Sequence, residues 1–149
     1  MICNLYYKLK KSVPISQRRI NLIINQIARI LKIKNNWEIT ILVVGDKQIK
    51  LLNKKFRHKD KVTDVLSFSQ KEGLPLVLPL GQSQYLGDIV ISWPQVVRQA
   101  KANDKKAIHE FVYLIIHGFL HLLGYKDERQ KDYQKMLKVQ EEIIAKIYD

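Results

Sequence analysis

The feature that most constrains the fold is an apolar run from Phe111 to Leu123, which contains no Lys, Arg, Asp or Glu and only two histidines. A helix that is apolar on nearly every face must be covered on all sides, so we expect this one at the centre of the molecule. The run is too short to span a bilayer. Burying two imidazoles in it costs free energy unless they have partners.

His117 and His121 stand four residues apart, so on a helix both rings project from one face, one turn from each other. Two imidazoles at this separation can share one tetrahedral metal ion. Gly124 follows, where a left-handed residue would end the helix and turn the chain back. Asp127 then occupies the third-ligand position of the metzincin spacing H-x3-H-x2-G-x2-ligand. The pattern predicts a zinc site of His117, His121 and Asp127; the alternative is a structural polar cluster.

The residue after His117 is Gly118, whereas a zinc peptidase of the H-E-x-x-H type carries its general-base glutamate at that position. Without this carboxylate the site lacks the group that activates water for peptide hydrolysis. A bound metal still lowers the pKa of a bound water and polarises a phosphoryl oxygen. The pattern therefore favours a hydrolase that relies on metal-bound hydroxide over a peptidase.

The remaining sequence predicts an α+β (mixed α/β) fold in one domain, residues 1–149, with one four-stranded mixed sheet and five or six helices. The metal site would lie at the end of the central buried helix. In the second helix we expect a buried stripe of Ile49, Leu52 and Phe56. Asp104 is the expected cap of the central helix. The expected strands are 2–8, 37–44, 62–68 and 85–92, a loop occupies 70–84, and the last helix covers 129–147.

The charge is strongly positive, with 26 Lys and Arg against 14 Asp and Glu, a net of +12. It is also uneven: one basic cluster lies before Glu38 and a second runs from Lys47 to Lys61. An asymmetric basic surface suits a phosphate-rich partner, because each contact with a phosphate releases counterions. Compositional drift is the alternative explanation.

A single cysteine, Cys3, excludes an intramolecular disulfide framework, so nothing requires an oxidising compartment. The N-terminus places its apolar residues before its charges, the reverse of a secretory signal. We therefore expect a cytoplasmic protein without membrane contact.

Three sequence blocks resemble the YbeY family of rRNA-maturation endoribonucleases. Residues 117–127 read HGFLHLLGYKD and match the family pattern H-G-x-L-H-L-x-G-Y. Residues 53–69 read NKKFRHKDKVTDVLSFS and resemble the family segment N-x-x-(F/Y)-R-x-K-D-x-P-T-(D/N)-V-L-S-F-P. Residues 87–91, GDIVI, match a third block, and the three occur in the family's order.

The resemblance implies that His117, His121 and the residue at 127 bind one zinc ion. It also implies that Arg57 lies near the metal cleft and acts on the substrate, so Arg57 and His117 are the predicted catalytic residues. The family motif ends in Asp-His, whereas this chain has Lys126-Asp127, which makes the third ligand a carboxylate. Two other acids, Glu128 and Asp132, are alternatives for that ligand, and Cys3 is a remote candidate for a fourth. A guanidinium such as that of Arg57 can hold a phosphate by two hydrogen bonds.

The function that the resemblance implies is a single-strand-specific metallo-endoribonuclease. It would mature the 3′ end of 16S rRNA and act in late-stage ribosome quality control, with a zinc-activated water attacking the phosphodiester. Lys54, Lys55 and Lys59 would hold the RNA backbone. Expected partners are rRNA and the small ribosomal subunit, and the protein itself is expected to be a monomer. The alternatives are a zinc metallopeptidase-like hydrolase and a non-catalytic ribosome-assembly factor with a structural zinc.

Overall fold

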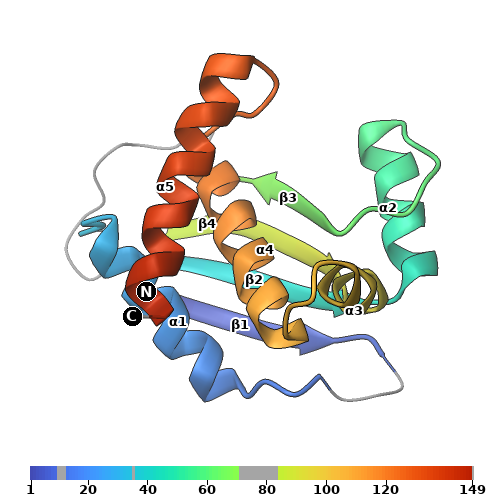
Figure 1. Cartoon of the computed structure of the whole chain (residues 1–149), viewed down its shortest axis with the longest axis horizontal. Coiled ribbons are helices and arrows are strands. Elements are labelled where there is room, and N and C mark those ends of the chain that lie inside the picture. The colour runs from blue at the N-terminus through green and yellow to red at the C-terminus, as the bar shows by residue number, and fades with distance from the viewer. Residues whose placement is uncertain (10–12, 35, 71–83, 149) are drawn as a thin grey trace.

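The computed structural model describes residues 1–9, 13–34, 36–70 and 84–148, which form a four-stranded sheet with five helices (Figure 1). The predicted α+β class is thus confirmed. Most of the loop expected at 70–84 lies outside the described residues. In chain order the elements are β1 (Ile2–Tyr7), α1 (Gln17–Ile30), β2 (Trp37–Val44), α2 (Asp46–Arg57), β3 (Val65–Ser69), β4 (Gln84–Ser92), α3 (Trp93–Ala102), α4 (Ala107–Leu122) and α5 (Gln130–Tyr148).

The sheet is mixed, as predicted, with strand order β1-β2-β4-β3. Strands β1, β2 and β4 are parallel, and β3 pairs antiparallel with β4 at one edge. β3 begins at Val65 rather than at Val62. Just before it, the Asp64 carbonyl accepts from the Ser92 amide at 2.9 Å, and the Asp64 carboxylate accepts from the Val65 amide at 2.8 Å on the free edge of the strand.

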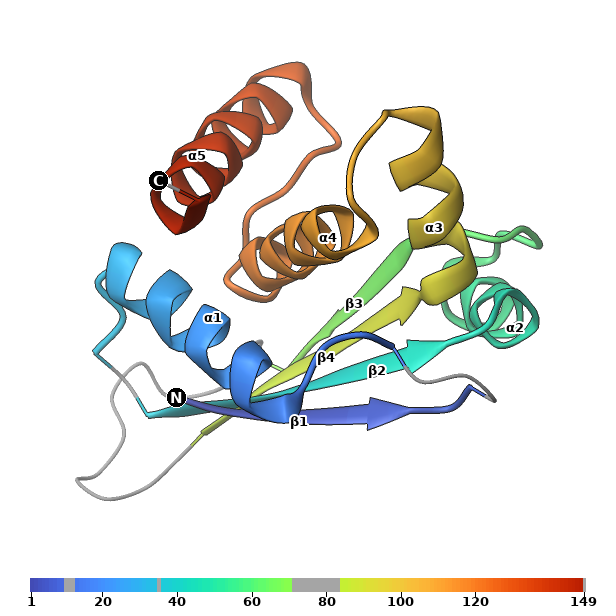
Figure 2. The same cartoon turned by 60° about the horizontal axis from the view of Figure 1, so that its bottom comes forward.

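The two faces of the sheet are covered differently. Alternate residues of the central strands, including Ile41 and Ile89, pack into the main core, and Figure 2 shows α1, α4 and α5 together on one side of the sheet. The opposite face carries a smaller cluster of Val44, Leu66 and Val90 with Ile49 of α2. No helix in the described part of the chain is long and apolar enough to cross a membrane.

Helix α4 is the buried centre of the molecule, as its composition predicts. Phe111, Ile115 and Phe119 are all 0% exposed. The expectation that Asp104 caps this helix is wrong: the N-cap is Lys106, without a side-chain hydrogen bond. Asp104 instead has a left-handed φ of 52° and follows the last turn of α3, where the Lys105 amide donates to the Ala100 carbonyl at 2.8 Å. The residue thus ends one helix rather than starting the next.

The buried stripe of α2 also differs from the prediction. Ile49 is 0% exposed as expected, but Leu52 is only partly buried and Phe56 is 51% exposed. The second buried position belongs to Asn53, 3% exposed, which donates from its amide to the Lys61 carbonyl at 2.9 Å. A buried amide is tolerated when it is hydrogen-bonded. Asn53 therefore ties the segment after α2 back onto the helix.

We expect Asn53→Ala to lower the free energy of unfolding by about 1–3 kcal/mol, because the hydrogen bond from the buried Asn53 amide to the Lys61 carbonyl is lost and the core loses atoms. Urea denaturation followed by circular dichroism measures this. Lys50→Ala, an exposed position of the same helix, is the control and should change stability by less than about 0.5 kcal/mol. Equal stability of the two variants would contradict the role given to Asn53.

Candidate metal centre

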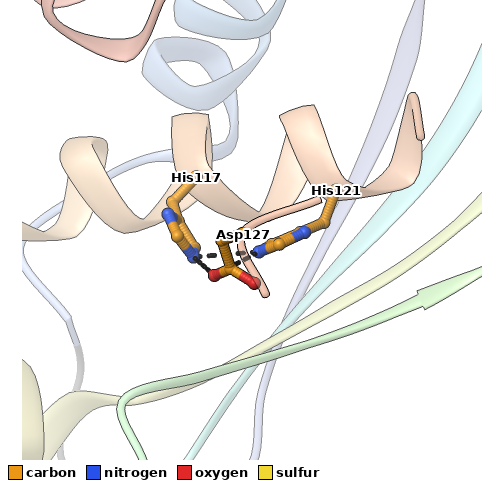
Figure 3. A group of neighbouring side chains, drawn as sticks. All are labelled: His117, His121 and Asp127. Atoms are coloured by element: carbon orange, nitrogen blue, oxygen red, sulfur yellow. Dashed lines mark hydrogen bonds and ion pairs between the residues drawn. The ribbon is translucent and has the colours of Figure 1, made fainter. Parts of the chain in front are cut away.

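The last two turns of α4 present both histidines on one face, as the four-residue spacing predicts. The Nε2 atoms of His117 and His121 are 3.1 Å apart, and their side chains are 25% and 26% exposed. Figure 3 shows the rings converging from successive turns of the helix with Asp127 between them. The pair is thus half-buried and open to solvent on one side.

The chain reversal expected at Gly124 is present and brings Asp127 to the histidines. Gly124 has a φ of +101°, and its amide donates to the His121 carbonyl while the Tyr125 amide donates to the Leu120 carbonyl, both at 3.0 Å. These two bonds form a Schellman motif, which favours glycine at the left-handed position. The Asp127 Oδ2 atom comes within 3.3 Å of His121 Nε2 and 3.9 Å of His117 Nε2.

The three ligand atoms fit a single metal ion. Their separations of 3.1, 3.3 and 3.9 Å form a compact triangle. In a tetrahedral zinc site, bond lengths near 2.0–2.1 Å place neighbouring ligand atoms about 3.3 Å apart. Among the described residues, the group of ligand-type side chains that meets here contains Asp127 but neither Glu128 nor Asp132. The remote candidate Cys3 is buried in β1, at the opposite edge of the sheet from β3.

The other nitrogen of each ring is held by an oxygen. His121 Nδ1 lies 2.9 Å from the Tyr125 carbonyl, and His117 Nδ1 lies 3.3 Å from Oε1 of Gln140. Since an oxygen acceptor requires a proton on Nδ1, both lone pairs are directed out from Nε2, where a metal would bind. Burial lowers the pKa of His117, which favours this neutral form, and the neighbouring His121 lowers it further.

Sequence reasoning missed Gln140. It is 2% exposed and lies on the inner face of α5, between Met136 and Ile143, which are also buried. The available signal was its position: Gln140 falls at the helical spacing of the buried apolar residues of α5, and a polar residue buried there needs a hydrogen-bond partner in the core. The partner is on another helix, however, and no spacing along the chain indicates which one.

Gly118 is turned toward the sheet. A Cβ atom at this position would lie 2.8 Å from Ile89 Cγ2 and 3.1 Å from Ser67 Oγ. Both distances are shorter than ordinary van der Waals contact, so α4 approaches β3 and β4 as closely as it does because residue 118 has no side chain. A glutamate here would have no room. The absence of the peptidase-type base is thus built into the packing of the helix.

A cleft of about 130 Å³ opens beside His117 between α4 and α5. Tyr113, one turn before His117, lines it together with Tyr133 of α5 and Asp64. The carboxylate of Asp64 accepts from Gln99 Nε2 at 3.2 Å and from the Val65 amide at 2.8 Å. Asp64 thus joins α3 to the start of β3 and also borders the cleft. The volume is enough for small groups or ordered water next to the histidines.

Arg57, the last residue of α2, reaches the free edge of β3. Its Nη2 atom donates to the Ser67 carbonyl at 2.6 Å. The hydroxyl of Ser67 in turn donates to the Gly118 carbonyl at 3.3 Å, next to His117 in the chain. Contacts therefore connect Arg57 to the metal-site helix. The predicted substrate-binding residues Lys54, Lys55 and Lys59 are exposed near the C-terminal end of α2.

We expect Gln140→Leu to weaken zinc binding about 10- to 100-fold, because the acceptor that orients the His117 ring is removed. Competition with a zinc-binding dye measures the affinity. Gln134→Leu, at an exposed position of α5, is the control and should bind zinc like the unchanged protein. Unaltered affinity in Gln140→Leu would show that the hydrogen bond does not support a metal.

We expect Gly118→Ala to lower the unfolding free energy by about 1–3 kcal/mol, since the added methyl overlaps Ile89 and forces α4 away from the sheet. Thermal unfolding measures the change. Gly124→Ala is the comparison that tests backbone strain without steric overlap. Nothing lies within 4 Å of its added Cβ, but its positive φ is strained for alanine. If Gly118→Ala melts like the unchanged protein, the close approach is not required.

Comparison with known proteins identifies the family of the chain. The sequence model of the family described as Endoribonuclease YbeY matches residues 6–148. A protein named Endoribonuclease YbeY from Syntrophomonas wolfei is 36% identical over 151 residues, covering 99% of this chain and 96% of the relative. One of the same name from Lacticaseibacillus casei is 40% identical over 118 residues, covering 77% and 76%.

The fold has a solved counterpart as well. The solution structure of a protein from Thermotoga maritima matches with a TM-score of 0.63 and 24% identity, covering 99% of this chain and 89% of the other. At this identity the likeness supports the fold alone. With the family match across nearly the whole sequence, the resemblance in the three sequence blocks is confirmed, and the chain belongs to the endoribonuclease YbeY family.

Proposed function

We propose that this chain is a zinc-dependent endoribonuclease that cleaves single-stranded RNA during maturation of the 3′ end of 16S rRNA and in late-stage ribosome quality control. The observation that carries the proposal is the triangle of His117 Nε2, His121 Nε2 and Asp127 Oδ2, which matches the ligand spacing of one zinc ion. Family membership supplies the reaction and the substrate class. The proposed partners are rRNA and the small ribosomal subunit, with a monomeric protein acting in the cytoplasm.

The bound zinc would supply a water of lowered pKa and polarise the scissile phosphoryl group. Three protein ligands leave one tetrahedral position for water or substrate, the arrangement of catalytic rather than structural zinc sites. His117 and His121 would hold the ion through Nε2, since Gln140 and the Tyr125 carbonyl lie beside their Nδ1 atoms. These contacts support a ring orientation suited to metal binding.

Arg57 is proposed to bind the scissile phosphate. One of its terminal nitrogens is occupied by the Ser67 carbonyl, which holds the guanidinium at the edge of β3. A guanidinium has five N–H donors, so others are available for phosphate oxygens and for charge that develops in the transition state. Lys54, Lys55 and Lys59 follow the same helix end and would contact neighbouring phosphates.

The peptidase alternative is disfavoured by Gly118, because the position of the general base faces Ile89 and Ser67 instead of the metal site. The structural-zinc alternative requires a fourth protein ligand. Among the described residues, the ligand group consists of His117, His121 and Asp127. Three ligands beside a cleft fit catalysis better than a closed structural site.

Metal analysis combined with cleavage of precursor 16S rRNA tests the proposal. The unchanged protein should hold about one zinc per chain and cleave the precursor. His121→Ala and Asp127→Ala should lose the metal and the activity. Arg57→Ala should keep the metal but lose most of the activity, and Arg57→Lys should recover only part, because lysine lacks the planar pair of donors.

The outcomes separate the parts of the proposal. An unchanged protein without zinc, equal in cleavage to His121→Ala, would overturn the metal assignment. Full zinc content in Asp127→Ala would show that another group is the third ligand. Zinc-dependent digestion of unfolded protein substrates, without RNA cleavage, would support the peptidase alternative instead. Zinc-dependent folding without any hydrolysis would support the assembly factor.

A further inference from the structure

An exposed phenylalanine sits among the basic residues at the end of α2. Phe56 is 51% exposed although its spacing from Ile49 and Leu52 predicts a buried position. Phe56 shares the inner side of α2 with Ile49, but it lies in the last turn of the helix, beside the edge strand β3. An exposed ring of this size leaves apolar area in water, which favours a partner that covers it.

The Phe56 ring is held by neighbouring side chains. Phe56 packs edge-on against Phe68 of β3, with centroids 5.2 Å apart and planes inclined by 65°. The ammonium of Lys55 lies 5.2 Å from the Phe56 centroid, and the guanidinium carbon of Arg57 lies 5.6 Å from that of Phe68. These four residues, Lys55, Phe56, Arg57 and Phe68, are called the aromatic-basic patch below. Cations thus contact both rings.

The aromatic-basic patch lies on one side of β3, and the helix of the candidate metal centre packs on the other. Phe68 joins the cluster on the α2 side of the sheet, whereas Ser67 and Ser69 hydrogen-bond to carbonyls of α4 on the other side. Arg57 lies at the free edge of β3, between these two sides of the sheet, and donates to the Ser67 carbonyl. In Figure 1, β3 runs between α2 and the C-terminal end of α4. The aromatic-basic patch and the metal-site helix thus contact opposite sides of β3, and Arg57 lies at the free edge between them.

We propose that Phe56 is a stacking platform for an unpaired base of the RNA substrate, a few nucleotides from the scissile phosphate held by Arg57. This inference rests on the proposed endoribonuclease function and names how its site selects single strands. An aromatic face between cations is the usual surface for single-stranded nucleic acid, because bases stack on the ring while the cations follow the phosphates. In a duplex the bases are already stacked on one another, so the platform favours unpaired RNA.

The charge around the ring argues for RNA rather than a protein partner. From Lys47 to Lys61 the only acid is Asp60, and it lies 3.7 Å from Lys54. The cationic excess on this helix is complementary to a polyanion. A protein partner that covers Phe56 is the competing occupant, and the experiment below distinguishes it.

The test uses the zinc-loaded protein and a short single-stranded oligoribonucleotide that carries one 2-aminopurine, whose fluorescence is quenched on stacking. Binding is read within seconds of mixing. The unchanged protein and Phe56→Trp should quench the probe, whereas Phe56→Ala should bind about tenfold more weakly and quench little. Leu51→Ala is the matched control: Leu51 is 55% exposed on the same helix and lies outside the patch.

Salt dependence separates stacking from charge. Phe56→Ala should keep the slope of log affinity against log salt, while Lys55→Ala should reduce it by about 0.7, the value for one phosphate contact with a single strand. Zinc content should stay the same in both variants, which shows that a weaker complex does not come from a damaged metal site.

Each outcome has one meaning. If the unchanged protein does not bind the oligonucleotide, the proposed function fails, and this inference fails with it. If it binds and Phe56→Ala binds and quenches equally well, the platform alone is wrong. If Phe56→Ala retains RNA binding but loses association with small-subunit ribosomal proteins purified free of RNA, the ring contacts a protein and the inference is overturned.

Discussion

The close contact of α4 with the sheet at Gly118 is the constraint on which the rest of the structure depends. The missing side chain lets the helix settle onto Ile89 and Ser67, and this depth sets where the next face of the helix points. His117 then borders the cleft toward α5, and His121 lies beside the Tyr125 carbonyl in the turn after Gly124. A larger residue at 118 would lift both histidines together.

Support for the candidate metal centre comes from three separate segments. Gly124 turns the chain so that Asp127 completes the triangle, α5 supplies the amide of Gln140, and β3 supplies the edge that holds Arg57. Hydrogen bonds therefore orient the metal-binding histidines and the Arg57 guanidinium within the fold itself. Preorganisation of this kind is what makes a site effective, since little ordering is left for the moment of binding.

Prediction from sequence succeeded where the information is local. The four-residue spacing of the histidines and the glycine three residues later are properties of one helix and its end, and the structure has both. The predicted fold class followed from short periodic patterns and is confirmed. Errors arose where tertiary packing decides the outcome: Asp104 ends α3 instead of capping α4, and Asn53 is buried on α2 whereas Phe56 is exposed.

The sequence by itself determined the candidate ligands, since helical periodicity and the glycine reversal act within a dozen residues. It also determined the family, because three blocks occur in the same order. Only the tertiary structure decided which oxygen lies beside His117 Nδ1, where Arg57 is anchored and that Phe56 is exposed. These features depend on contacts between segments far apart in the chain, which follow from how the helices pack on the sheet.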